Sequence, residues 1–92
     1  MRVLVDTNVL IRLFQRSNPS SPIAASAIQE LKKHEFEIVI GKSAHDARLV
    51  AAMVKHSVPN ILTFNVQDFM RYSQVKAFNP VDILAGLLPR VT

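Results

Sequence analysis

The chain of 92 residues contains no cysteine. This absence excludes disulfides, zinc sites with thiolate ligands and cysteine nucleophiles, and it fits a reducing compartment. No apolar run approaches the roughly 20 residues that a membrane-spanning helix needs, so we expect no membrane contact. The opening segment is interrupted by Asp6, Asn8 and Arg12 and lacks a cleavage site of small residues, which argues against a signal peptide. We therefore expect a cytoplasmic protein.

The composition is that of a globular protein, with 49% hydrophobic and 20% charged residues. Repeats, linkers and low-complexity stretches are missing, so we interpret residues 1–92 as a single domain. The net charge is +4, and a surplus of positive charge attracts nucleic acid. The eleven Lys and Arg residues are spread along the chain. Charge alone therefore leaves RNA binding and a merely basic surface equally open.

Strand-like and helix-like segments alternate along the chain. Residues 2–5 form the kind of apolar run found in strands buried on both faces, and Ser21-Pro22 is typical of a cap followed by a first helical residue. The expected strands are residues 2–5, 36–40, 61–64 and 75–78. The expected helices begin near Asn8, at Pro22, at Ser43, at Asn65 and at Asn79-Pro80, and the last two run through Arg71 and to just before Pro89. This alternation predicts an α/β fold with a parallel sheet flanked by helices.

Polar residues gather at the expected strand exits and helix starts, in residues 6–8, 43–46 and 63–68. Ligands of parallel sheets bind at the carboxyl ends of the strands, near the point where strand order reverses. If the first and third strands are neighbours, all three clusters meet at one edge. Two carboxylates about 4 Å apart repel by ~4 kcal/mol at an effective dielectric of about 20. A proton or a divalent cation such as Mg²⁺ or Mn²⁺ must relieve that repulsion, and a metal there can activate water.

Each acidic residue also has a structural interpretation. Ser43-x-x-Asp46 matches a capping box, so Asp46 is balanced between a helix cap and a metal ligand. Asn65-x-x-Asp68 fits the same pattern, and a cap is the preferred interpretation of Asp68. Asp6 directly follows a buried strand and has no pairing partner nearby in the sequence, which favours a functional role.

Three segments carry a resemblance to a known family. Residues 3–11 (VLVDTNVLI) resemble the opening of a PIN domain, and residues 45–52 and 62–69 resemble its closing half. Together the segments resemble bacterial PIN ribonucleases of the VapC toxin type. The resemblance implies a three-layer α/β/α fold with a short parallel sheet and an acidic pocket that binds Mg²⁺ or Mn²⁺. It also implies a metal-dependent endoribonuclease that forms homodimers and is inhibited by a small antitoxin.

The resemblance also assigns individual residues. Asp6 becomes the first metal acid and Asp46 the later helix acid, while the fourth acidic position falls on Asn65 with Asp68 close by. The expected catalytic residues are thus Asp6, Asp46 and Asp68, and the first two hold the metal. The remaining expected site residues are the supporting Thr7, Asn8, Thr63 and Asn65 and the RNA-binding Arg12 and Arg48.

One part of the family pattern is missing. In the family, the segment after the second strand continues into helices that carry a Glu, followed by another strand and helix. Here residues 38–40 run directly into Gly41 and the Asp46 helix, so the domain is shortened in the middle and lacks that Glu. The lost segment includes an edge strand, and its loss uncovers apolar surface that self-association could cover.

Three hypotheses follow from these features. The first is a metal-dependent endoribonuclease. The second is a catalytically inactive remnant that dimerises or binds RNA or an antitoxin, which the missing Glu favours. The third is a receiver-like phosphoacceptor, which is disfavoured because no paired acids precede Asp6.

Overall fold

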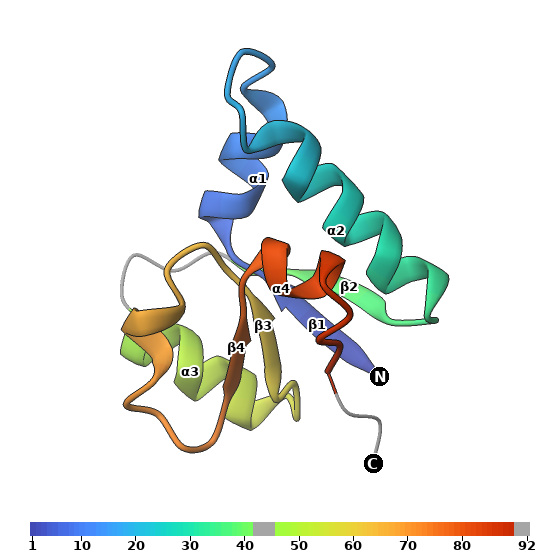
Figure 1. Cartoon of the computed structure of the whole chain (residues 1–92). Coiled ribbons are helices and arrows are strands. Elements are labelled where there is room, and N and C mark those ends of the chain that lie inside the picture. Colours follow the sequence, from blue (N-terminus) through green and yellow to red (C-terminus); the bar gives the residue numbers. More distant parts are fainter. Residues whose placement is uncertain (42–45, 90–92) are drawn as a thin grey trace.

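The structure, a computed structural model, describes residues 1–41 and 46–89 (Figure 1). Its strands form one parallel sheet in the order β2-β1-β3-β4. The strands are β1 (Arg2–Val5), β2 (Glu37–Ile40), β3 (Asn60–Leu62) and β4 (Lys76–Phe78). The helices are α1 (Thr7–Phe14), α2 (Ser21–Lys33), α3 (Asp46–Lys55), the 3-10 helix η1 (Val66–Phe69) and α4 (Pro80–Leu84). The predicted α/β class with a parallel sheet is confirmed.

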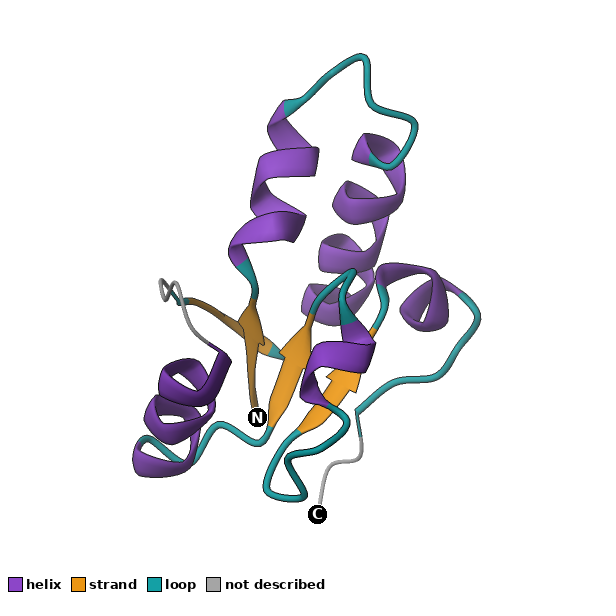
Figure 2. Ribbon diagram, turned by 90° about the vertical axis from the view of Figure 1, so that its left-hand side faces the viewer, coloured by secondary structure: helices purple, strands orange, loops and turns teal. Residues whose placement is uncertain are grey.

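The strands end level with one another. Val5 of β1 pairs with Ile40 on one side and Leu62 on the other, and Leu62 pairs with Phe78. The residues that follow these four positions therefore lie along a single edge of the sheet. Figure 2 shows α1 rising from this edge, directly beyond the carboxyl end of β1.

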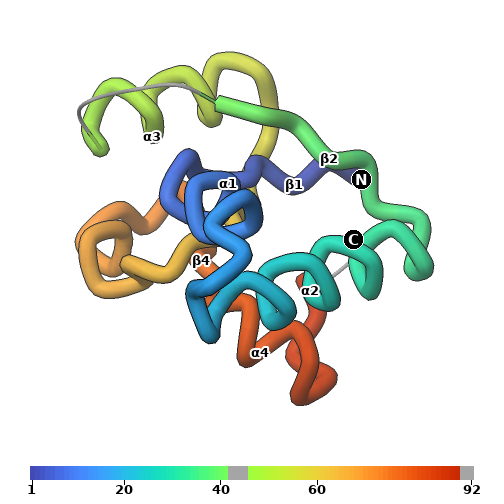
Figure 3. The backbone as a smooth tube through the Cα atoms, turned by 90° about the horizontal axis from the view of Figure 1, so that it is seen from above, coloured from blue at the N-terminus to red at the C-terminus, as the bar shows by residue number. Residues whose placement is uncertain are grey.

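Helices cover both faces of the sheet. Side chains alternate along a strand, so Val3 and Val5 join one apolar cluster while Leu4 joins another. The first cluster contains α2 and α4 residues, and the second contains α3 and η1 residues. Figure 3 shows α3 on one side of the strands and α2 with α4 on the other. None of the described helices is long and apolar enough to cross a bilayer.

The last helix begins where the sequence predicts and ends earlier. Asn79 forms a capping box, because its Oδ1 accepts from the backbone N–H of Val81 at 2.9 Å and Asp82 accepts from the backbone N–H of Asn79 at 3.3 Å. The helix stops at Leu84 rather than near Pro89, because the chain turns through Gly86, which has a φ of 92°. Glycine adopts that left-handed conformation without steric cost.

Other predicted boundaries shift where side chains find distant partners. The predicted cap at Ser21 is wrong, because Ser21 is the first residue of α2 and its hydroxyl donates to the carbonyl of Leu13 at 2.9 Å. The third strand ends at Leu62 rather than at Phe64, whose N–H turns to the side chain of Asn8 at 3.4 Å. The helix predicted from Asn65 is the short η1. The start of the Ser43 helix lies outside the described residues.

Candidate functional site

Asp6 occupies the N-cap position of α1, but its side chain points elsewhere. An aspartate at this position usually accepts a hydrogen bond from the first helical turn. Within the described ranges, the Asp6 carboxylate makes no such capping bond. Its Oδ2 instead accepts a hydrogen bond from the hydroxyl of Thr63 at 2.9 Å. Its backbone N–H donates to the carbonyl of Leu62 at 3.0 Å, which continues the ladder between β1 and β3.

The Thr63 hydroxyl uses its full hydrogen-bonding capacity. The side chain is fully buried, and its oxygen accepts from the Asn8 side-chain amide at 3.3 Å and from the Asn65 backbone N–H at 3.0 Å. A hydroxyl carries one hydrogen and two lone pairs. Since both lone pairs are engaged by N–H donors, the hydrogen goes to Asp6. The orientation of the carboxylate is thus fixed by the residue that directly follows β3.

The two residues after Asp6 form hydrogen bonds to the residues that directly follow the neighbouring strands β2 and β3. Asn8 bridges to β3, since its amide donates to Thr63 and its carbonyl accepts from the N–H of Phe64. Thr7 bridges to β2, because its hydroxyl donates to the carbonyl of Gly41 at 3.2 Å. The predicted supporting residues Thr7, Asn8, Thr63 and Asn65 therefore all lie within one network around Asp6, Asn65 through its backbone.

This network lies at the switch point of the sheet, where the order of the strands reverses. The chain passes from β1 to β2 on one side and then to β3 on the other side of β1. Such a switch point leaves a crevice outside the carboxyl ends of the two diverging strands. Asp6 follows β1 and Thr63 follows β3, so the pair stands at the switch point. Asp6 is only partly buried although it directly follows a buried strand, whereas Thr63 beside it is fully buried.

Arg12 lies next to the network, one helical turn beyond Asn8. Its guanidinium stacks over the ring of Phe64, 4.3 Å from the ring centroid. A cation over an aromatic face gains about 0.5–1 kcal/mol at an exposed site, and the contact holds the planar donor group beside the crevice. Sequence spacing did not identify Phe64, although its position directly after Thr63 is a usable signal. Arg48 is exposed on α3.

The second predicted metal acid, Asp46, is the first residue of α3. It is partly buried, and a carboxylate in the first helical turn is stabilised by the helix dipole. The rest of the predicted capping box, Ser43, lies outside the described residues, as does His45. The helix itself packs through Leu49 and Met53 onto the sheet face that carries Leu4.

Asp68 lies on η1, the helix that connects β3 to β4. It is exposed on η1 and, with Asn65, Gln67 and Asn79, lines a polar hollow of about 290 Å³. Among the described residues, the Asn65 side chain makes no capping bond to η1, so the predicted Asn65 cap is wrong. The backbone N–H of Asp68 donates to the carbonyl of Asn65 at 3.0 Å. The structure thus places Asp68 in this hollow, whose lining does not include Asp6.

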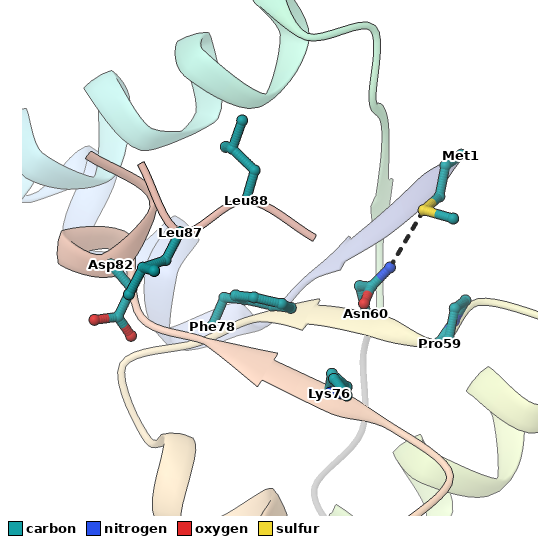
Figure 4. A pocket seen from close by; sticks show the side chains of 8 residues that line it. All are labelled: Met1, Pro59, Asn60, Lys76, Phe78, Asp82, Leu87 and Leu88. Carbon is teal, nitrogen blue, oxygen red and sulfur yellow. Dashed lines mark hydrogen bonds between the residues drawn. The ribbon is translucent and has the colours of Figure 1, made fainter. Parts of the chain in front are cut away.

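A second hollow extends from the amino ends of the strands along β4 to Phe78 and Asp82. It measures about 530 Å³, and Figure 4 shows the residues that line it, among them Met1, Asn60, Lys76 and Phe78. Asn60 is buried, and its amide contacts the sulfur of Met1 at 3.5 Å. Met1, Asn60 and Lys76 lie at the amino ends of β1, β3 and β4, whereas Phe78 ends β4 and its carbonyl accepts from the N–H of Thr63. The lining does not include Asp6 or Thr63.

The acidic side chains do not build a closed metal cage in the part of the chain that the structure describes. No three Asp, Glu or His residues there come together as a possible cation site. Mg²⁺ is commonly held by only one or two carboxylates, with water and substrate phosphates completing its shell. Asp6 supplies one such carboxylate at the end of β1.

Comparisons with models of known protein families, with curated proteins and with solved structures find no match to this chain.

Proposed function

We propose that the chain is a shortened three-layer PIN-like domain of the VapC toxin type and acts as a divalent-metal-dependent endoribonuclease. The observation that carries the proposal is the Asp6 carboxylate, which stands at the switch point and is held by the buried Thr63 hydroxyl instead of capping α1. A partly exposed carboxylate fixed in this way suits a metal ligand, because a hydrogen-bonded partner orients the ligand before the metal arrives.

Asp6 and Asp46 are the residues that would hold Mg²⁺ or Mn²⁺. The Thr63 hydroxyl donates to Oδ2 of Asp6 and so orients the carboxylate that would hold the metal. A bound divalent cation supplies an activated water and stabilises charge on a phosphoryl group. Thr7 and Asn8 keep the loops after β2 and β3 in place around the carboxylate.

The basic residues supply RNA contacts in this proposal. Arg12 presents a planar guanidinium beside the crevice, where its stacking on Phe64 limits its motion, and guanidinium groups pair well with phosphate. Arg48 lies two residues beyond Asp46 on the exposed side of α3. Asp68 is the third proposed acid, next to the Asn65 backbone that meets Thr63. A small antitoxin that covers the crevice belongs to the same proposal.

The substitution Asp6→Asn tests the proposal. Asparagine keeps an oxygen that can accept from Thr63, so the fold should persist while the metal ligand is lost. We expect RNA cleavage in Mg²⁺ or Mn²⁺ to fall by roughly 100-fold or more, as for other groups that stabilise charge in the transition state. The matched control is Glu30→Gln, which makes the same charge change on α2, where the Glu30 carboxylate pairs with His34 at 3.1 Å. Cleavage that survives Asp6→Asn, or that ignores a chelator, rejects the metal-nuclease proposal.

The alternative is a PIN-like remnant that binds RNA without cleaving it. The incomplete set of acids around Asp6 favours this alternative, and the net charge of +4 supports binding. It predicts no cleavage by the unmodified chain, together with RNA binding that weakens as salt rises. Arg12→Gln should then weaken RNA binding. The slope of the logarithm of the binding constant against the logarithm of salt concentration should become shallower by about 1, as expected for one lost phosphate contact.

A further inference from the structure

The outer edge of β2 is open. β2 ends the strand order, and within residues 1–41 and 46–89 no strand pairs with its outer side. Three of its four residues are apolar, and Ile40 is 63% exposed. Exposed edge strands are usually protected by charges, prolines or bulges, because their unpaired backbone groups recruit other strands. Glu37 is the only charged residue of β2.

The direction of the backbone groups along this edge can be worked out. The N–H of Glu37 donates to the carbonyl of Met1 at 2.9 Å, so Glu37 directs its backbone groups toward β1. These directions alternate along a strand. The N–H and C=O groups of Val39 therefore also point toward β1, whereas those of Ile38 and Ile40 point outward.

We propose that a second copy of the chain binds here by adding its own β2 antiparallel to this edge, across a two-fold axis at Val39. In this register, Ile38 of each copy lies opposite Ile40 of the other. Each such pair exchanges two N–H···O bonds, because an antiparallel hydrogen-bonded pair needs two residues with outward backbone groups. The interface is isologous, since the same strand contributes both sides.

The side chains are complementary in the same register. Ile38 packs against the cluster that contains α2, and Val39 packs against the cluster that contains α3. Ile40 shares the face of Ile38, so the isoleucines of both copies come together there and cover the exposed Ile40. The two Val39 side chains meet on the opposite face, at the rim of a hollow of about 390 Å³ lined by Leu4 and Leu49.

Charge and backbone hydrogen bonding together favour this register over shifted registers of the two strands. Glu37 falls opposite Gly41 of the other copy, so no like charges oppose each other across the strands. A shift by one residue would place an outward-facing residue opposite an inward-facing one and lose the hydrogen bonds. A shift that places Ile38 opposite itself would put Ile40 opposite Phe36, which precedes β2. The edge therefore fits a second copy of itself best when Val39 lies on the axis.

A single-cysteine variant tests the geometry. The chain has no cysteine, so Val39→Cys introduces one thiol per copy. Residues opposite each other in a non-hydrogen-bonded antiparallel pair have Cα atoms about 4.5 Å apart, within the range of a disulfide. We expect Val39→Cys to form a disulfide-linked dimer under mild oxidation, seen on a non-reducing gel. Glu37→Cys, on the same strand and face, should cross-link at least about tenfold more slowly, because those residues lie beyond the roughly 7 Å limit.

Sedimentation of the chain without cysteine provides the second measurement. A four-residue strand pair buries less than the roughly 800 Å² per partner of stable complexes, so we expect a dissociation constant in the micromolar range. Ile40→Lys should weaken dimerisation by about tenfold or more, because a lysine at the edge blocks strand addition. Ile11→Lys, which replaces a similarly exposed isoleucine on α1 (52% exposed), should leave it unchanged. A monomer at about 100 μM, equal effects of the two lysine variants, or equal cross-linking at Glu37 and Val39 would overturn the proposal.

Discussion

Replacing Thr63 with valine keeps the shape of the side chain and removes its hydroxyl, and we expect the chain to lose about 2–4 kcal/mol of unfolding free energy. The hydroxyl donates to Asp6 at 2.9 Å and accepts from Asn8 and from the Asn65 backbone. A hydrogen bond to a charged group contributes about 1.5–3 kcal/mol, and each neutral one about 1 kcal/mol. We count the two neutral bonds only in part, because water can reach the partly buried Asn8.

The matched variant is Thr63→Ser, which keeps the hydroxyl and removes one buried methyl group. Its cost should be about 1 kcal/mol. The valine variant should therefore unfold more easily than the serine variant by about 1–3 kcal/mol. A 92-residue domain has a total stability of roughly 5–14 kcal/mol, so both variants should still fold and the difference should be large enough to measure.

Urea unfolding at 25 °C, followed by circular dichroism, gives the required comparison. The midpoint should fall without a change in slope, because the surface exposed on unfolding stays the same. A double-mutant cycle with Asp6→Asn should yield a coupling of about 1–2 kcal/mol. If the valine variant matches or exceeds the serine variant in stability, the Thr63 hydroxyl does not hold Asp6 as we describe.

Two further substitutions test the packing around the site. Gly41→Ala should lower the unfolding free energy by about 1–2 kcal/mol, since a Cβ at residue 41 would lie 2.7 Å from Cδ1 of the buried Leu4; unchanged or higher stability in urea would show that Leu4 moves aside freely. Asn79→Ala should cost about 1 kcal/mol because it removes the cap of Val81, whereas Asn79→Ser should restore most of that loss. Equal thermal midpoints for the alanine and serine variants would contradict a capping role.

The sequence predicted the fold to the extent that local patterns determine it. The apolar run of β1, the alternation of strands and helices and the placement of Asp6 at a strand exit all follow from residues adjacent in the chain. The predicted start of the last helix at Asn79-Pro80 is confirmed, because Asn79 caps it through the N–H of Val81, two residues away. The register of the strands could not be predicted in this way, since it depends on pairing between distant segments.

Short polar side chains at helix starts account for some of the predictions that were wrong. Such a side chain can bond either to the local backbone or to a distant group, and only the local choice is visible in the sequence. Ser21 bonds to Leu13 across the turn between two helices, and Asp6 bonds to Thr63, 57 positions away. The sequence placed Asp6 and Thr63 near the same sheet edge. It could not show that the Asp6 carboxylate accepts from Thr63 rather than from the backbone of its own helix.

The central position of β1 also determines how the chain can fold. The first strand pairs with both β2 and β3, where Arg2 meets Glu37 and Val3 meets Asn60, and neither partner can form a hairpin with it. Each pairing must close a long loop before it gains any contact, which slows folding relative to a helical bundle of the same length. Of the four strands, β1 comes first in the sequence, and it is paired on both sides only after β3 has been made.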